Sequence, residues 1–199
     1  MSHKGYTLEH DIEKLLLDVD GKTNKDPIIK ADGQGFGRSF RVPSSGAMQS
    51  LKGDCISAIS WLPKQLKVEC KHRFTETKKG GQLIRVEIDW INKNNEEALR
   101  DNQLSILVIK FKGARNSVWF IMEPDVLGTL SPSDLSIVYQ EFKVIENKQK
   151  TKFILSNRDL KDVDTIYYCN VLGKTLVYYS EKEFTKLLYT IKEKNNEKK

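Results

Sequence analysis

The stretch "KVECKHR" at residues 67–73 places a carboxylate and an ammonium two positions apart in what otherwise has the pattern of a buried β-strand. Side chains alternate between the two faces of a strand, so Glu69 and Lys71 point to one face and Cys70 points to the other. Two further basic residues follow immediately. The segment that precedes this stretch indicates what faces these charges.

That preceding segment predicts a β-hairpin. Residues 54–60 and 65–71 have the composition of two short strands, and "WLPK" at 61–64 connects them. Folding the hairpin between Leu62 and Pro63 sets residue 54 opposite residue 71 and residue 56 opposite residue 69. Because the side-chain period of a strand is two, this register determines which side chains share a face.

Three charged side chains meet on one face of the predicted hairpin, near its open end. Asp54, Glu69 and Lys71 come together there, whereas Cys55 and Cys70 are cross-strand neighbours on the opposite face. We expect the thiol face to belong to the core and the charged face to form a site.

The two carboxylates of this face repel each other unless a positive charge lies between them. A hard divalent cation such as Mg²⁺, bound through oxygen ligands, removes that conflict. Lys71 can then orient a water molecule or stabilise charge that develops on a phosphate. The alternative is a surface ion pair between Asp54 and Lys71, which contributes ~0.2–1 kcal/mol. The spacing of the residues leaves both interpretations open.

The rest of the chain predicts helices that alternate with strands. Leu8, Ile12, Leu15 and Leu16 recur at helical spacing after Thr7, which is expected to be the N-cap. This order indicates an α/β or α+β protein with a mixed sheet. The expected elements are a helix at 7–17, a basic loop at 18–40, a short strand in 40–47, an exposed loop at 74–82, a helix at 89–102, strands at 104–111 and 117–122, short strands within 134–179, and a helix at about 181–193 capped by Ser180 and Glu183.

The aromatic residues are interpreted as packing residues. Trp61, Trp90 and Trp119 are expected to pack within the protein and not to stack on bases. The C-terminal tyrosines are expected to build a small accessory core. They are Tyr167, Tyr168, Tyr178 and Tyr179.

The composition limits the classes of protein that fit. The chain has 199 residues, 39% of them hydrophobic and 30% charged, which suits one domain with appendages or two small domains. No apolar run approaches the ~18 residues of a membrane span, and the N-terminus has no signal-peptide pattern. Three cysteines without a C-x-x-C pair argue against a disulfide framework or a zinc ribbon and favour the reducing cytoplasm. The net charge of +6 favours a polyanionic partner.

Four motifs in the chain resemble a known group of enzymes. "GD" at 53–54 and "ECK" at 69–71 resemble the PD-(D/E)xK nuclease superfamily, in which an Asp is followed after a hairpin by Glu-x-Lys. "KGYTLEHDIEKLL" at 4–16 and "RVPSSGA" at 41–47 resemble segments of archaeal Holliday junction resolvases, and "ILVIKF" and "VWFIM" stand where that family has its later strands. The chain departs from the family in its long 18–40 segment, in Gly-Asp instead of Pro-Asp, and in residues 125–199, which have no counterpart.

The resemblance implies a fold and a set of metal ligands. The fold would be α/β, a restriction-endonuclease-like mixed sheet flanked by helices, with a nuclease core at 1–124 and a C-terminal extension of strands and a helix at 125–199. Glu9, Asp54 and Glu69 match the acidic metal ligands, the Cys70 carbonyl is a further oxygen, and Lys71 matches the catalytic lysine. The alternative for Glu9 is a first-turn residue favoured by the helix dipole.

The resemblance also implies contacts to DNA. Ser45 matches the serine that contacts the scissile phosphate, and Ser44 is the alternative equivalent. Basic side chains around the site are expected to hold the DNA backbone, with ion pairing, a solvated strand end or snorkelling to the surface as the alternatives. They are Arg41, His72, Arg73, Lys110 and Lys112.

The function implied is that of a Mg²⁺-dependent endonuclease, with Mn²⁺ as a substitute, that cuts four-way DNA junctions in a prokaryotic or viral setting. Two symmetric cuts with one site per chain require a two-fold homodimer. The first alternative is the same chemistry on linear duplex or single-stranded DNA. The others are an inactive DNA-binding module and a purely structural protein.

Overall fold

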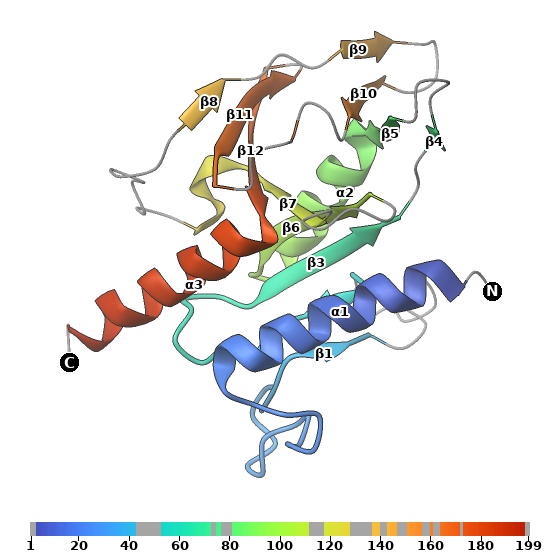
Figure 1. Cartoon of the computed structure of the whole chain (residues 1–199). Coiled ribbons are helices and arrows are strands. Elements are labelled where there is room, and N and C mark those ends of the chain that lie inside the picture. Colours follow the sequence, from blue (N-terminus) through green and yellow to red (C-terminus); the bar gives the residue numbers. More distant parts are fainter. Residues whose placement is uncertain are drawn as a thin grey trace.

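The structure, a computed structural model, shows two β-sheets, three α-helices and one short 3₁₀ helix in the part of the chain that it describes. Figure 1 shows the larger sheet crossing the molecule between the helices. The described residues are 3–42, 53–72, 75–76, 81–111, 118–127, 137–139, 143–146, 151–156, 160, 164–171 and 173–197.

The larger sheet has eight strands in the order β1-β2-β3-β6-β7-β12-β11-β8. β3 runs parallel to β6 and β11 runs parallel to β8, whereas the other neighbours are antiparallel. The sheet is therefore mixed, as predicted, and the fold is α/β. The strands are β1 (Phe40–Arg41), β2 (Cys55–Ile56), β3 (Leu66–Lys71), β6 (Leu104–Lys110), β7 (Val118–Met122), β8 (Ile137–Tyr139), β11 (Ile166–Val171) and β12 (Lys174–Ser180).

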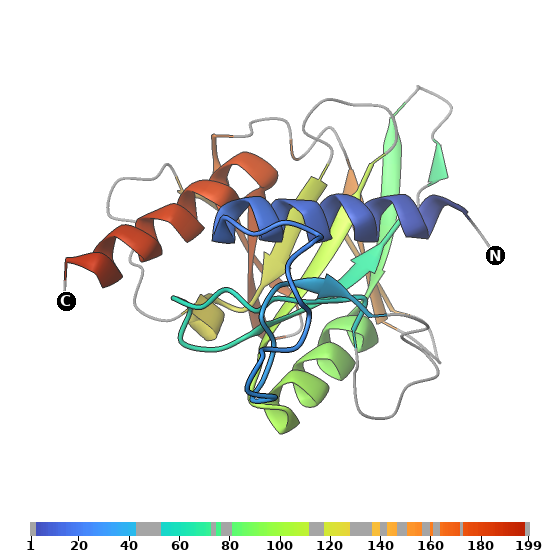
Figure 2. The ribbon, with the colours of Figure 1, turned by 90° about the horizontal axis from the view of Figure 1, so that it is seen from below.

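Helices cover both faces of the larger sheet, consistent with a restriction-endonuclease-like fold. α1 (His3–Asp20) and α3 (Glu181–Asn196) lie on one face, and α2 (Ile88–Arg100) lies on the other (Figure 2). A short 3₁₀ helix, η1 (Pro124–Leu127), follows β7. Within the described residues, no helix has an apolar stretch long enough to cross a membrane.

Alternating side chains explain why both faces need covering. In β6, Ile106 and Val108 join the core cluster under α1 and α3, whereas Leu107 and Ile109 join the cluster under α2. A strand buried on both faces has the near-continuous apolar sequence predicted for 104–111. β6 thus lies in the middle of the protein, beside the charged strand β3.

The two helices on the first face begin differently from each other. α1 starts at His3, so Thr7 lies inside the helix and is not its N-cap. This prediction was wrong because the helix continues beyond Thr7 toward the N-terminus, past the apolar stripe from which the N-cap was inferred. α3 agrees with the prediction, since the Ser180 side chain accepts a hydrogen bond from the Glu183 backbone N–H at 3.2 Å.

The hairpin pairing was predicted correctly in its topology and incorrectly in its register. β2 and β3 are antiparallel, but Cys55 lies opposite Val68 and Ile56 opposite Lys67. The pairing is therefore shifted by two residues, and Cys70 lies diagonal to Cys55 instead of opposite it. The same register continues to Ser57, whose N–H bonds to the Leu66 carbonyl at 2.9 Å, and a turn follows in which the Leu62 N–H bonds to the Ile59 carbonyl at 3.2 Å. A shift of two residues keeps every side chain on its predicted face.

A second sheet occupies a region where the sequence predicts an exposed loop. β4 (Thr75–Glu76), β5 (Gln82–Glu87), β10 (Thr151–Ser156) and β9 (Lys143–Glu146) form it in that order, all antiparallel. Ile84 and Val86 of β5 are fully buried in the α2-side core. Within the loop predicted at 74–82, the structure describes residues 75–76 and 81–82, and Thr75, Glu76 and Gln82 belong to strands there; residues 74 and 77–80 lie outside the described part of the chain. The local sequence did not indicate this sheet because the other partner of β5, β10, lies far away in the sequence.

The C-terminal tyrosines do not form an accessory core. Tyr167 and Tyr178 are buried in the α2-side cluster, and Tyr179 is buried in the α1-side cluster. Tyr168 is partly buried against the latter. The correction follows from the pairing of β12 with β7, which makes these strands part of the main sheet.

Backbone hydrogen bonds within the segment that follows α1 hold its conformation. The Gly37 N–H bonds to the Ile28 carbonyl at 2.8 Å, and Ile29 and Phe36 form an antiparallel bridge. Arg38 ties the segment to α1, because its Nη1 lies 3.0 Å from Glu13 Oε1. This basic insertion is therefore a small hydrogen-bonded hairpin.

Candidate active site

Backbone geometry holds Asp54 beside the end of β3. The Asp54 N–H bonds to the Val68 carbonyl at 2.8 Å, which continues the β2–β3 pairing by one residue. The Asp54 Oδ2 in turn accepts a hydrogen bond of 2.7 Å from the Cys70 N–H. The carboxylate is thus fixed next to Glu69 and Lys71 through bonds to the strand that carries them.

The glycine before Asp54 is required by the local backbone. Gly53 has φ +92°, and a Cβ there would lie 3.0 Å from Lys67 Cγ and 3.2 Å from the Val68 carbonyl oxygen. Proline cannot take this φ, because its ring fixes φ near −65°. Gly-Asp in place of Pro-Asp is therefore a consequence of how β2 passes over β3 in this chain.

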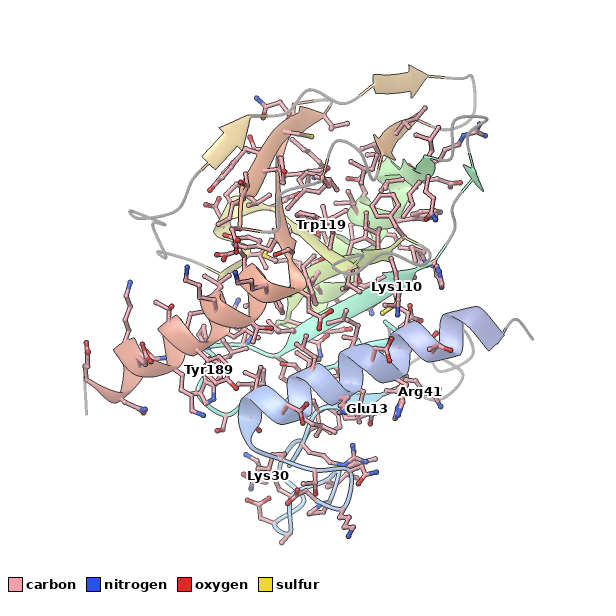
Figure 3. All side chains as sticks on the ribbon, in the orientation of Figure 1. Glu13, Lys30, Arg41, Lys110, Trp119 and Tyr189 are labelled. Carbon is pink, nitrogen blue, oxygen red and sulfur yellow. The ribbon has the colours of Figure 1, made fainter. Side chains whose placement is uncertain are left out.

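Glu9 approaches the same region from α1. The Cys55 thiol donates a hydrogen bond of 3.3 Å to the Glu9 backbone carbonyl, so β2 fixes this turn of the helix. The Glu9 carboxylate lies 4.0 Å from Nη1 of Arg41, which β1 places beside it. Arg41 lies next to α1 in Figure 3, above the loop that carries Lys30.

The three carboxylates act on one another electrostatically. Burial is the largest cause that raises the pKa of Glu9 above its usual value, and the charge of Asp54 raises it further while Arg41 opposes the shift. The pKa of Glu69 is also raised, first by burial and then by Asp54, with Lys71 acting in the opposite sense. Glu69 also contributes to the raised pKa of Glu9. The charge of Asp54 therefore acts on Glu9 of α1 and on Glu69 of β3.

The donor set suits a hard divalent cation. Glu9, Asp54 and Glu69 offer carboxylate oxygens, the ligand type that Mg²⁺ and Mn²⁺ take. Among the described residues, however, the structure shows no group of three or more His, Cys, Asp or Glu side chains arranged so that they could hold a metal ion. The ammonium of Lys71 is the cation that lies against Glu69, through a direct ion pair with Glu69 Oε1.

A comparison with known protein families identifies the family to which this chain belongs. The model of a family described as "Phage putative PDDEXK endonuclease" matches residues 1–172. The chain belongs to this family. No curated protein and no solved structure matches the chain.

Membership of this PDDEXK endonuclease family confirms the PD-(D/E)xK superfamily and supports a nuclease activity, for which the family implies DNA as the substrate. The match is to phage endonucleases and gives no support to the archaeal resolvase branch in particular. It extends across residue 124, the position at which the sequence alone suggests a division.

The other basic residues predicted for the site lie in different places. Lys110 does not join the carboxylates, because its Nζ lies 2.7 Å from Asp11 Oδ2 of α1, on the opposite face of the sheet from Lys71. In Figure 3, Lys110 and Arg41 lie on opposite sides of α1. His72 follows Lys71 and is half-buried. Four predicted contacts lie outside the described residues, namely Ser44, Ser45, Arg73 and Lys112.

Two residues near the site were not predicted to belong to it. Lys67 is fully buried and pairs with Glu97 of α2 at 2.6 Å. Trp90, interpreted from the sequence as a packing residue, lies with its ring centroid 5.5 Å from Lys71 Nζ. The alternation of Lys67, Glu69 and Lys71 was visible in the sequence and could have pointed to the first pair. No sequence signal pointed to the second.

Proposed function

We propose that the protein is a Mg²⁺-dependent endonuclease that hydrolyses phosphodiester bonds at Glu9, Asp54, Glu69 and Lys71. The proposal rests on the position of Asp54, which is hydrogen-bonded to the backbone of β3 beside the Glu69–Lys71 ion pair, and on the raised pKa of Glu9 and of Glu69, which burial and the charge of Asp54 cause. Groups whose pKa values are shifted in this way cluster at functional sites.

Each residue has a role that its position supports. Glu9, Asp54 and Glu69 would hold the divalent cation, with the Cys70 N–H orienting Asp54. When bound, the cation supplies water activation and neutralises charge on the phosphate. Lys71 would donate to the oxygen on which charge develops in the transition state. Arg41, beside Glu9, would contact a neighbouring phosphate of the DNA backbone.

The proposed substrate is a four-way DNA junction that a homodimer cuts in symmetric pairs. The resemblance of "KGYTLEHDIEKLL" and "RVPSSGA" to archaeal resolvases supports this choice. The second candidate is an endonuclease acting on linear duplex or single-stranded DNA, and the phage endonuclease family supports it equally well. The two candidates share their chemistry and differ in the shape of the DNA.

Cleavage assays test the site and the substrate together. An end-labelled four-way junction and a linear duplex of the same sequence are incubated with the protein and Mg²⁺. We expect paired nicks in the junction, abolished by Asp54→Asn and by Lys71→Ala. The matched controls are Asp164→Asn and Lys182→Ala, which remove an exposed aspartate and lysine that pair with each other outside the site.

Each result has a defined meaning. Equal cutting of the linear duplex would keep the chemistry and move the substrate to the second candidate. Unchanged cutting by Asp54→Asn would contradict the proposed site. Binding without cutting in both Mg²⁺ and Mn²⁺ would identify an inactive DNA-binding module. The proposed dimer is tested separately by measuring the mass of the protein in solution with and without the junction.

A further inference from the structure

Two lysines flank Glu69 on one face of β3, and α2 gives each of them a different partner. Lys67 pairs with the carboxylate of Glu97 at 2.6 Å. Lys71, at the other end, lies 5.5 Å from the ring centroid of Trp90. Trp90 and Glu97 are seven residues apart, or about 10 Å along a helix, and the two lysines are four residues apart, or about 13 Å along a strand. α2 therefore runs alongside β3 in the opposite direction, with one partner for each lysine.

The position of the Trp90 ring is determined by the surrounding core. Trp90 is half-buried and packs against the α2-side cluster. Ile88 and Ile91, on either side of it, are buried in the same cluster. One turn later, the buried Asn94 side chain donates to Ser105 Oγ at 2.8 Å. The ring is thus presented to Lys71 by a helix fixed to the sheet.

An aromatic partner and an acidic partner have different consequences for Lys71. A carboxylate at position 90 would add a negative charge beside Asp54 and Glu69, and it would compete with both for a cation. An indole ring attracts an ammonium through its quadrupole without titrating and without ligating a metal. Lys71 is 22% exposed and already pairs with Glu69. When a cation engages the Glu69 oxygens, the Trp90 ring still contacts the Lys71 ammonium among the residues that the structure describes.

We propose that Trp90 is a positioning residue for Lys71. It holds the Lys71 ammonium at the end of β3, directed toward the scissile phosphate, while Glu69 serves the divalent cation. This inference rests on the proposed nuclease function and adds a residue that acts through Lys71 and does not contact the metal. It also distinguishes Trp90 from a residue that only fills space, since an aliphatic side chain of similar burial would lack the effect.

Two substitutions of Trp90 test whether Lys71 depends on the aromatic ring or only on the size of the side chain. Trp90→Leu keeps an apolar side chain without a ring, and Trp90→Phe keeps a ring with a weaker quadrupole. We expect Trp90→Leu to lower kcat by about 3- to 30-fold with KM unchanged, and Trp90→Phe to recover most of that loss. The matched control is Trp61→Leu, because Lys192 Nζ lies 5.9 Å from the Trp61 ring outside the site. It should leave kcat unchanged.

A second measurement reads the contact without cleavage. In protein labelled with ¹³C-lysine, the ε-methylene protons of Lys71, assigned with Lys71→Arg, should be shifted upfield by the ring current. Trp90→Leu should remove that shift and Trp61→Leu should leave it. Absence of the shift in the wild type, equal losses of kcat in Trp90→Leu and Trp90→Phe, or unchanged kcat in Trp90→Leu would each overturn the role of Trp90. A wild type that cuts no DNA although the shift is present would instead overturn the proposed nuclease function.

Discussion

Glu9 and Glu69 should make the stability of the metal-free protein depend on pH. Burial and the charge of Asp54 raise the pKa of Glu9 and of Glu69 above 4.5. A carboxyl group with a raised pKa in the folded state contributes stability below its unfolded pKa, and that contribution is lost as the pH rises through the folded pKa. The metal-free protein should therefore lose stability from these two groups as the pH rises from below 4.5 through their raised values.

Asp54→Asn should stabilise the metal-free protein. The amide removes the charge that raises both pKa values, and its oxygen can still accept the Cys70 N–H bond. We expect the melting temperature at pH 7 in EDTA to rise by roughly 1–4 °C. At pH 4, where Glu9 and Glu69 are largely protonated, the difference from the wild type should shrink. An Asp54→Asn variant that is less stable than the wild type at pH 7 would contradict the repulsion.

Divalent cations should offset the loss of stability that the charged carboxylates cause. Mg²⁺ or Mn²⁺ that binds only the folded state stabilises it by RT ln(1 + [M]/Kd), about 2.7 kcal/mol at a hundred times Kd. Because protons compete for the same oxygens, the rise in melting temperature should be larger at pH 8 than at pH 5. Thermal denaturation at millimolar Mg²⁺ measures it, and Asp54→Asn should lose the effect. A cation effect of the same size in Asp54→Asn would place the ion elsewhere.

Gly53 offers a steric test beside the site. Gly53→Ala should lower the melting temperature because a Cβ at φ +92° would press on Lys67 Cγ at 3.0 Å and on the Val68 carbonyl oxygen at 3.2 Å. The control is Gly173→Ala, which has φ +76° but no atom within 4 Å of the added Cβ. Both variants carry ~1 kcal/mol of backbone strain. Only Gly53→Ala adds the contact, so equal losses in the two variants would refute the steric argument.

At the scale of elements, the Lys67–Glu97 pair joins the charged strand to α2. Lys67 is 0% exposed, whereas the Glu97 side chain is 19% exposed. Removing one member of a buried pair leaves the other charge without compensation, and the cost depends on whether that charge can reach water. Substitution of Lys67 and substitution of Glu97 should therefore lower the stability of the protein by different amounts.

Glu97→Leu should cost more stability than Lys67→Met. The first leaves a fully buried ammonium, with an expected loss of about 3–5 kcal/mol, and the second leaves a carboxylate that reaches solvent, with a loss of roughly half that. The double variant should lie closer to the wild type than Glu97→Leu does. Urea denaturation of all four proteins measures the cycle. Additive losses would show that the two groups do not interact.

At the scale of the whole molecule, residues beyond 124 complete the main sheet. β12 pairs with β7, and α3 covers the same face as α1, where Phe184 stacks on Phe120 with ring centroids 4.0 Å apart. β7 would otherwise be an exposed edge with a bare apolar face. The strand that carries the site, β3, reaches β7 through β6 alone.

A chain truncated after residue 124 should therefore fail to fold on its own. It would expose Phe120, Ile121 and Met122, which β12 and α3 cover in the full chain. We expect loss of the cooperative thermal transition and aggregation, measured by circular dichroism and light scattering. A cooperative transition in residues 1–124 would show that the sheet is stable without its C-terminal strands.

Local sequence periods predicted most of the strands and helices and the side chains that share the charged face of the β2–β3 pair. Strand periodicity placed Asp54, Glu69 and Lys71 on one face of a hairpin, and the pairing confirms that face, because a shift of two residues does not change it. Helical spacing likewise predicted the apolar stripe of α1, of which Leu8, Ile12 and Leu16 are buried.

Which distant groups lie near that face depends on how the helices pack on the sheet. The approach of Glu9 depends on how α1 packs on β2, and the partners of Lys67 and Lys71 depend on how α2 packs on β3. The second sheet depends on a pairing between β5 and β10, which are far apart in the chain. Strand and helix periods specify which face a side chain occupies, but they carry no information on which other element covers that face.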